Sequence, residues 1–172
     1  MATPNRALFP GRSLLLFLVG ALFLAACRGG LEQATLAKVD QMEQAWLAAP
    51  VSSYRIVVDV DRPDDRRRNE LLVEDGAVVQ ATVKYWNPQR KAWDEPFPLN
   101  PEQAEPFTVP GLFEMVREQI QLPERAQVQV KWREEPPMPE LIVLGPVSMN
   151  GQPVSGTEAT VFLEEFEPLE GK

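Results

Sequence analysis

The spacing of apolar residues along the chain predicts two amphipathic helices. In residues 31–49, and again between Thr108 and Pro123, apolar positions recur every three or four residues, with charged and amide residues between them. Pro50 and Pro123 end the two patterns, and Thr108 is a suitable N-cap. The first stripe is Leu31, Thr35 (weakly apolar), Val39, Met42 and Trp46, and the second is Val109, Leu112, Phe113, Val116 and Ile120. One interpretation of Met42 and Trp46 is a stripe that contacts a ligand. Their helical spacing favours the other interpretation, burial in a core.

Six further segments show the alternation, or the short apolar run, that is typical of strands. They are residues 54–61, 69–73, 77–85, 126–133, 141–144 and 160–166. Asp75-Gly76 predicts a hairpin between the second and third segments, because both positions of such a turn need a positive φ. The register stays open: a two-residue turn sets Leu72 opposite Val79 and Glu70 opposite Ala81, so a longer loop or a β-bulge is also compatible.

Residues 87–110 contain six prolines and no sustained period, which predicts an extended surface loop. Trp86, Trp93 and Phe97 allow two interpretations. Exposed aromatic side chains suit contact with a protein or glycan partner, so these three are the candidate partner-binding residues. The alternative, which we favour, is that they fold back over the sheet as a lid on the core.

The predicted order is helix, three strands, loop, helix and three strands. Strands joined by short turns favour antiparallel pairing. We therefore expect an α+β fold, with the N-terminal amphipathic helix and the second helix packed on a curved, mainly antiparallel sheet of about six strands. Residues 31–172 are expected to form a single domain.

Residues 1–26 have the features of a secretion signal. Arg6 and Arg12 precede an apolar run, residues 14–24, that is too short to span a bilayer. The run ends in Leu24-Ala25-Ala26-Cys27, which resembles the lipobox of bacterial lipoproteins. That resemblance implies a diacylglycerol on the Cys27 sulfur, cleavage between Ala26 and Cys27, and often a further acyl chain, such as palmitate, on the new amino terminus. An ordinary signal peptide or a buried core cysteine is the alternative.

The lipoprotein interpretation fixes the expected location. Residues 27–30 become a short lipidated tether, and two or three acyl chains, at about 0.8 kcal/mol per buried methylene, hold a protein durably at a membrane. We expect an extracytoplasmic protein anchored to the cell membrane or, because Arg28 follows the cysteine, to the outer membrane of a cell with two membranes. The anchor is the expected membrane contact.

The mature chain is acidic and lacks the usual catalytic side chains. Removal of residues 1–26, which contain two arginines and no acidic residue, leaves 146 residues. These include 15 basic and 25 acidic residues, a net charge of −10. That charge disfavours nucleic acid. With no histidine and no second cysteine, Ser-His-acid, Cys-His and disulfide chemistry are excluded. We expect no enzyme activity and no cofactor.

Two kinds of carboxylate cluster remain. Asp59, Asp61, Asp64 and Asp65 lie within seven residues and suit Ca²⁺, but Arg62 and Arg66–Arg68 also suit direct ion pairs with them, and we favour the ion pairs. No metal site is therefore expected. The neighbours Glu134-Glu135 and Glu164-Glu165 are expected to point to opposite faces of their strands, as solvated charges rather than a catalytic pair.

Several residues resemble an uncharacterised family of small bacterial lipoproteins, domain of unknown function 6174. They are Trp46, Tyr54, the hairpin residues Val73, Asp75, Gly76 and Val78, and the helix start Thr108, Val109, Leu112 and Phe113. The resemblance covers roughly residues 46–166. It implies an envelope location and a shared fold. It implies no activity, because none is established for the family.

Two functional hypotheses follow. The first, which we prefer, is a non-catalytic binding or assembly module for an envelope protein or glycan. The second is a carrier, or a weak carboxylate-dependent hydrolase, for an apolar or glycan ligand held between the helices and the sheet. A filled core favours the first, whereas a cavity of several hundred Å³ with a converging carboxylate favours the second.

Overall fold

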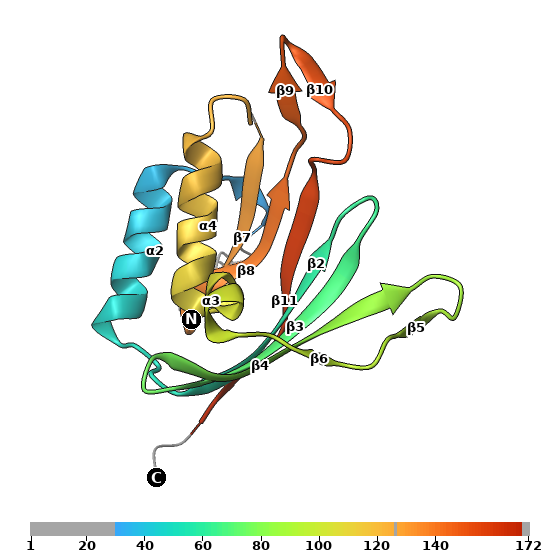
Figure 1. Cartoon of the computed structure of the whole chain (residues 1–172). Helices are drawn as coiled ribbons and strands as arrows, with labels where there is room; N and C mark the ends of the chain where they lie inside the picture. The colour runs from blue at the N-terminus through green and yellow to red at the C-terminus, as the bar shows by residue number, and fades with distance from the viewer. Residues whose placement is uncertain (1–29, 126, 170–172) are drawn as a thin grey trace, which may run out of the picture.

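The computed structural model describes residues 30–125 and 127–169 (Figure 1). Helices α2 (Leu36–Ala48) and α4 (Val109–Gln121) lie side by side on one face of a mainly antiparallel sheet. The fold is α+β, as the sequence predicts. Cys27, Ala26 and the rest of the signal lie outside the described residues. Within the described ranges, no helix is long and apolar enough to cross a membrane.

The main sheet has nine strands rather than six. Its order is β1-β7-β8-β11-β2-β3-β4-β5, and β6 also pairs with β4. The six expected strands are the long ones: β2 (Tyr54–Asp61), β3 (Arg66–Glu74), β4 (Ala77–Asn87), β7 (Val128–Glu134), β8 (Pro137–Leu144) and β11 (Ala159–Pro168). The additional strands, β1 (Glu32–Gln33), β5 (Ala92–Trp93) and β6 (Phe97–Pro98), have two residues each. A segment that short cannot display a period.

A small hairpin projects beyond the main sheet (Figure 1). Its strands, β9 (Val147–Met149) and β10 (Gln152–Val154), form a separate two-stranded sheet. The segment 87–110 is also more ordered than its prolines predict. Besides β5 and β6, it contains the short helix α3 (Pro101–Ala104) and the 3₁₀ turn η2 (Glu105–Phe107), so it is not an unbroken loop.

The β3–β4 hairpin combines a two-residue turn with a β-bulge. Asp75 and Gly76 have φ values of 51° and 80°, as the turn requires. Val73 pairs with Val78, but Leu72 pairs with Gln80, so Val79 is the extra residue. The bulge sets Leu71 opposite Ala81, and both side chains are buried. Of the registers left open by the sequence, the structure has the bulge.

The first helix begins later than predicted, at Leu36. Thr35 is its N-cap and accepts a hydrogen bond from the Lys38 backbone N–H at 3.3 Å. The preceding residues form β1, which pairs with β7, and Leu31 is 43% exposed. Val39, Met42 and Trp46 are buried, so the predicted core stripe is confirmed for these three residues.

The second helix begins as predicted. The Thr108 side chain accepts a hydrogen bond from the Gly111 N–H at 3.1 Å. Its apolar residues Val109, Leu112, Phe113 and Val116 are buried against the sheet. We call the side of the sheet that α2 and α4 cover the helix face, and the opposite side the open face. In β2, Tyr54, Ile56, Val58 and Val60 all lie in the core of the helix face.

Candidate functional site

A cavity of about 500 Å³ lies between the helix face of the sheet and the segment α3–η2–α4. Ten of its fifteen described lining residues are apolar or aromatic: Val60, Val83, Tyr85, Leu99, Pro106, Phe107, Met115, Leu144, Ala159 and Val161. The other lining residues are Arg62, Arg67, Asn69, Gln103 and Gln119. No aspartate or glutamate is among the described residues that line it. A concave, mostly apolar wall with a few polar groups is the usual form of a small-molecule site.

Two polar atoms in the cavity wall have no partner in the described part of the chain. They are the Arg67 Nε, on β3, and the Gln119 Oε1, on α4, and both are buried. The Arg67 guanidinium lies 5.4 Å from the centroid of the Phe107 ring, in cation–π contact. Asn69, by contrast, donates to the Val58 carbonyl at 3.1 Å. Arg67 and Gln119 therefore retain unused hydrogen-bonding capacity in the cavity wall, where the side chains of Arg62 and Gln103 also lie.

Positive charge gathers near this cavity. Arg62 lines the cavity, and its charge repels that of Arg125. Burial, and then the charge of Arg62, hold the pKa of Arg125 below its ordinary value. Arg125 donates to the carbonyls of Gly145 and, at 3.0 Å, Thr157. In the described ranges, Arg62, Arg67 and Arg125 form no ion pair with a carboxylate.

A second hollow, of about 850 Å³, lies between α3, α4 and the β3–β4 turn. Its wall has the opposite charge, since it includes five glutamates: Glu43, Glu102, Glu105, Glu114 and Glu118. It is larger than the first cavity, but its described charged lining residues are all glutamates, of which Glu43 and Glu114 pair with Arg117. An anionic ligand would be repelled there.

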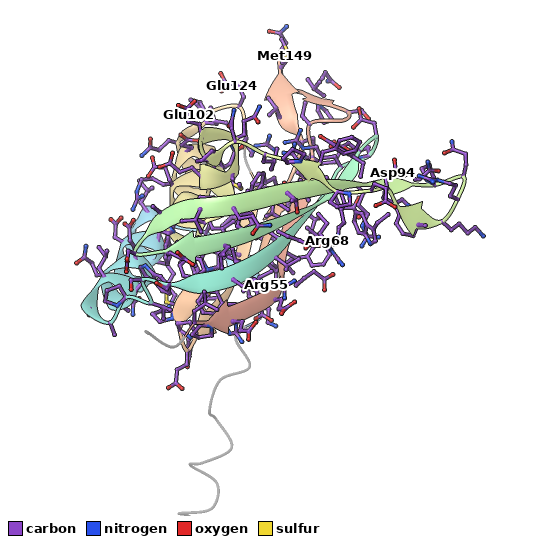
Figure 2. All side chains as sticks on the ribbon, turned by 60° about the horizontal axis from the view of Figure 1, so that its bottom comes forward. Arg55, Arg68, Asp94, Glu102, Glu124 and Met149 are labelled. Carbon is purple, nitrogen blue, oxygen red and sulfur yellow. The ribbon has the colours of Figure 1, made fainter. Side chains whose placement is uncertain are left out.

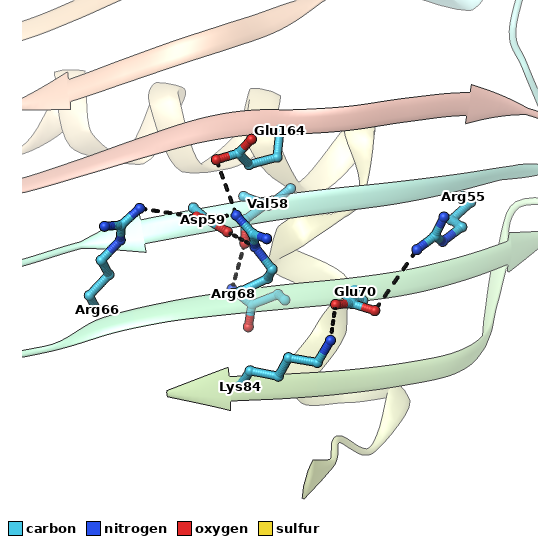
Figure 3. A network of polar contacts seen from close by, with 9 residues as sticks. Arg55, Val58, Asp59, Arg66, Arg68, Glu70, Lys84 and Glu164 are labelled. Carbon is cyan, nitrogen blue, oxygen red and sulfur yellow. Dashed lines mark hydrogen bonds and ion pairs between the residues drawn. The ribbon is translucent and has the colours of Figure 1, made fainter. Parts of the chain in front are cut away.

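Charged side chains pair extensively on the open face (Figures 2 and 3). The Asp59 side chain is fully buried and accepts two hydrogen bonds from Arg68, at 2.7 and 2.9 Å. Arg66 lies 3.6 Å from the same carboxylate, and Glu164 accepts from Arg68 at 3.1 Å. Because of Asp59, and despite partial burial, the pKa of Arg68 is raised above its ordinary value.

A second group of ion pairs extends this network along the sheet. Glu70 accepts a hydrogen bond from Lys84 at 2.6 Å and lies 4.0 Å from Arg55 (Figure 3). Arg55 in turn donates to Glu165 at 3.1 Å. Each charge of the network faces an opposite charge within the chain, so this surface is electrostatically matched without a ligand.

The prediction that Glu164 and Glu165 point to opposite faces is wrong. A β-bulge between Leu163 and Glu165 makes Glu164 the extra residue of β11. The carboxylates of both glutamates consequently reach arginines of the open face. They lie beyond Phe162, where β11 pairs with β2 but no longer with β8, and their contacts are ion pairs.

The aspartate-rich segment also forms ion pairs. Asp59 is paired with Arg66 and Arg68, as the favoured interpretation predicts. Asp61 and Asp64 are exposed. Across residues 30–125 and 127–169, no three His, Cys, Asp or Glu side chains converge as metal ligands. Arg62 and Arg67, expected to pair with these acids, line the cavity instead.

The structure brings Trp86 and Trp93 together but on the open face. Their rings meet edge to face at 5.5 Å, across the β4–β5 pair. Arg66 lies 5.3 Å and Arg68 lies 4.8 Å from the Trp93 ring. The two tryptophans fold back onto the sheet, as expected of a lid, but they cover arginines rather than the core. Phe97, on β6, is 55% exposed. Partner binding by these three residues stays a prediction.

The strand period could have identified the cavity residues. Within β3, alternation sends Arg66 and Arg68 to the open face and Arg67 to the helix face. Because three consecutive arginines follow four aspartates, the local charge pattern concealed this alternation. No sequence pattern assigned Gln119 to the cavity, because its neighbours depend on how α4 packs against the sheet.

No family model matches this chain, and no curated protein matches it significantly. The resemblance to domain of unknown function 6174 and the lipobox at Cys27 therefore stay predictions. The function has to be argued from the site itself.

Proposed function

We propose that this chain is a membrane-anchored envelope lipoprotein whose domain binds, without chemical change, a ligand with a substantial apolar part. The observation that carries the proposal is the cavity of about 500 Å³ between the sheet and α3–η2–α4. Its volume lies within the range of roughly 300–1,000 Å³ that is usual for small-molecule sites. Transfer of an apolar group from water into such a space contributes about 25 cal/mol per Å² of buried apolar surface.

The location is proposed from the sequence. A basic front, an apolar run and Leu24-Ala25-Ala26-Cys27 support export and acylation of Cys27. The first strand of the domain, β1, begins at Glu32, five residues after that cysteine. An anchored domain would thus work within a short distance of a lipid surface, from which apolar ligands can be drawn. Metabolic labelling with palmitate tests the anchor, because labelling that persists in Cys27→Ala would contradict it.

The alternatives have weaker support. A carboxylate-dependent hydrolase needs an acid directed into its site, and none of the described residues that line the cavity of about 500 Å³ supplies one. The second hollow has glutamates, but Glu43 and Glu114 are paired with Arg117 there. An assembly module that uses the open face would have to compete with the ion pairs already formed there. Phe97 is the best candidate for a residue by which such a module contacts its partner, because it is an exposed aromatic side chain on the strand β6.

A cavity-filling variant tests the proposal. Val161 lines the cavity and is 4% exposed, whereas its neighbour Thr160 alternates to the open face. The mature chain, with Cys27→Ser to avoid detergent, is titrated with the neutral fluorophore N-phenyl-1-naphthylamine. We expect saturable binding to the parent chain and to Thr160→Trp, and at least about tenfold weaker binding to Val161→Trp. Equal binding by the two tryptophan variants would overturn the proposal, provided that both melt cooperatively.

A further inference from the structure

Resting on the proposed function, we infer that the ligand is an anionic amphiphile. Its negatively charged head lies against Arg67, and its apolar part fills the space between Phe107, Met115 and Val161. The geometry that points to this class is a guanidinium on the wall of an apolar cavity, with a buried Nε that has no partner in the described part of the chain.

Arg67 is suited to this role by its surroundings. Its guanidinium lies over the Phe107 ring at 5.4 Å, so the ring supports one face of the planar cation. In the described ranges no hydrogen bond from its N–H groups is formed, and a carboxylate or phosphate accepts from a guanidinium through two oxygens. Gln119 adds a side-chain carbonyl without a donor, which suits a hydroxyl or amide N–H next to the charged head.

The distribution of charge selects an anion rather than a neutral polar head. The chain as a whole carries −8, and five of the nine arginines in the described ranges are paired: Arg55, Arg66, Arg68, Arg90 and Arg117 each lie within 4.0 Å of a carboxylate oxygen. At the cavity, Arg62 and Arg67 have no such contact in the described ranges, and no described lining residue is acidic. A half-buried cation is stabilised by an opposite charge, and here the chain does not provide it.

The apolar wall selects an amphiphile rather than a free inorganic anion. Phosphate alone would gain nothing from the apolar residues of the cavity wall, such as Phe107, Met115 and Val161. A fatty acid or an alkyl phosphate satisfies both parts of the site at once. Both share the chemistry of an anionic head on an alkyl chain, and the titration below separates them.

Isothermal titration of the mature chain carrying Cys27→Ser tests the inference. Decanoate, decyl phosphate, decanol and inorganic phosphate are each titrated into the parent chain and into Arg67→Gln. We expect one or both decyl anions to bind about tenfold more tightly than decanol. Arg67→Gln should remove that preference and leave the affinity for decanol unchanged. Inorganic phosphate should bind weakly or not at all.

Matched variants keep the result interpretable. Arg133→Gln, on β7, removes the same charge from a residue that does not line the cavity, and it should retain the preference for decyl anions. Arg67→Lys should retain part of it, because the charge remains but the planar fork is lost. Thermal melts establish that each variant is folded. If Arg67→Gln does not fold, Arg67→Lys and the ratio of decanoate to decanol affinity in the parent chain decide the question.

The outcomes separate the inference from the proposed function. If decanol binds the parent chain as tightly as both decyl anions, the anionic head is refuted while an apolar site stands. If Arg67→Gln keeps the preference for decyl anions, the assignment of the head to Arg67 is refuted. Tight binding of phosphate alone would refute the amphiphile. If none of the decyl compounds binds, the proposed function itself fails.

Discussion

Arg68 donates hydrogen bonds to both carboxylate oxygens of Asp59, from Nε to Oδ1 at 2.7 Å and from Nη2 to Oδ2 at 2.9 Å. The two residues lie opposite each other on β2 and β3, where paired side chains share a face of the sheet. The Asp59 side chain is fully buried although it lies on the open face, because Arg66 and Arg68 contact its carboxylate and Trp93 lies over both arginines. The pair therefore supports the sheet from the side that no helix covers.

We predict that Arg68→Ala lowers the free energy of unfolding by about 3 kcal/mol, since removal of one partner leaves a buried charge uncompensated. Arg66, at 3.6 Å, offsets only part of this loss. Urea denaturation measures the change. Arg90→Ala is the control, because its exposed pair with Asp94 should contribute less than about 1 kcal/mol. Replacing both partners, as Asp59→Leu with Arg68→Met, should restore most of the stability. A loss in Arg68→Ala no greater than in the control would show that the pair is dispensable.

The tryptophan pair gives a prediction that separates structural support from partner binding. Trp93 packs edge to face on Trp86 and covers Arg66 and Arg68. We expect Trp93→Ala to lower the free energy of unfolding by about 1–2 kcal/mol through lost aromatic and cation–π contacts. Phe97→Ala should change it by less than about 0.5 kcal/mol, because this side chain is 55% exposed. The opposite ranking in thermal or urea melts would contradict this assignment.

Phe97→Ala is accordingly the better test of a macromolecular partner. Crosslinking in native membranes, followed by mass spectrometry, compares the parent chain with this variant. Loss of a specific crosslinked protein from a variant of unchanged stability would favour the assembly module. Retention of every crosslink would argue against a partner at this residue.

Tyr54 couples stability to alkaline pH. The Val109 backbone N–H donates to its hydroxyl oxygen at 3.2 Å. Burial raises the pKa of Tyr54 above 10.0, and the hydrogen bond from Val109 opposes the shift only in part. Above pH 10.0, Tyr54 of the unfolded chain loses its proton before Tyr54 of the folded chain does. The contribution of neutral Tyr54 to the free energy of unfolding is complete below that pH and is lost as the pH rises toward the pKa of Tyr54 in the folded chain.

We therefore predict that Tyr54→Phe loses about 1 kcal/mol at pH 8, where the hydrogen bond is lost and no ionisation is involved. Between pH 10 and pH 11, the free energy of unfolding of the parent chain should fall more steeply than that of the variant, by up to about 1.4 kcal/mol per pH unit. Urea titrations at pH 8, 10 and 11 give both quantities. Parallel pH profiles for the two chains would be inconsistent with a raised pKa of Tyr54.

The long elements could be predicted from the sequence because each repeats its period several times. Tyr54 to Val60 alternates over a full strand, and Val39, Met42 and Trp46 mark the buried face of α2. The bulges at Val79 and Glu164 could not be placed, since an extra residue depends on pairing across strands that no local pattern records.

The candidate site was harder to predict than the fold. Its wall combines residues of β2, β3, β4, β8 and β11 with residues of segment 87–110 and α4. The prolines of segment 87–110 predict a loop, so the short elements α3 and η2 could not be recognised from the sequence. Arg67 was grouped with its neighbours as a surface charge. The alternation of β3 and the pairing of Arg67 with Tyr85, on the helix face, assign it to the cavity.

Gly111 links the start of α4 to the cavity wall and gives the last prediction. A Cβ on this residue would lie 2.7 Å from the Pro106 Cα and closer still to the Glu105 carbonyl oxygen, so η2 rests directly on the glycine. In an exposed helix, Gly→Ala is stabilising by about 1 kcal/mol. Here the clash is with backbone, so we expect Gly111→Ala to destabilise the chain by about 1–3 kcal/mol.

The same variant should displace η2, which carries Pro106 and Phe107 into the cavity wall. Weaker binding of N-phenyl-1-naphthylamine is therefore expected to accompany the lower stability. Glu118→Ala, an exposed position on α4, is the control and should leave both stability and binding nearly unchanged. If Gly111→Ala raised the melting temperature, η2 would not be in contact with the helix start, and the cavity wall as described would be wrong at that point.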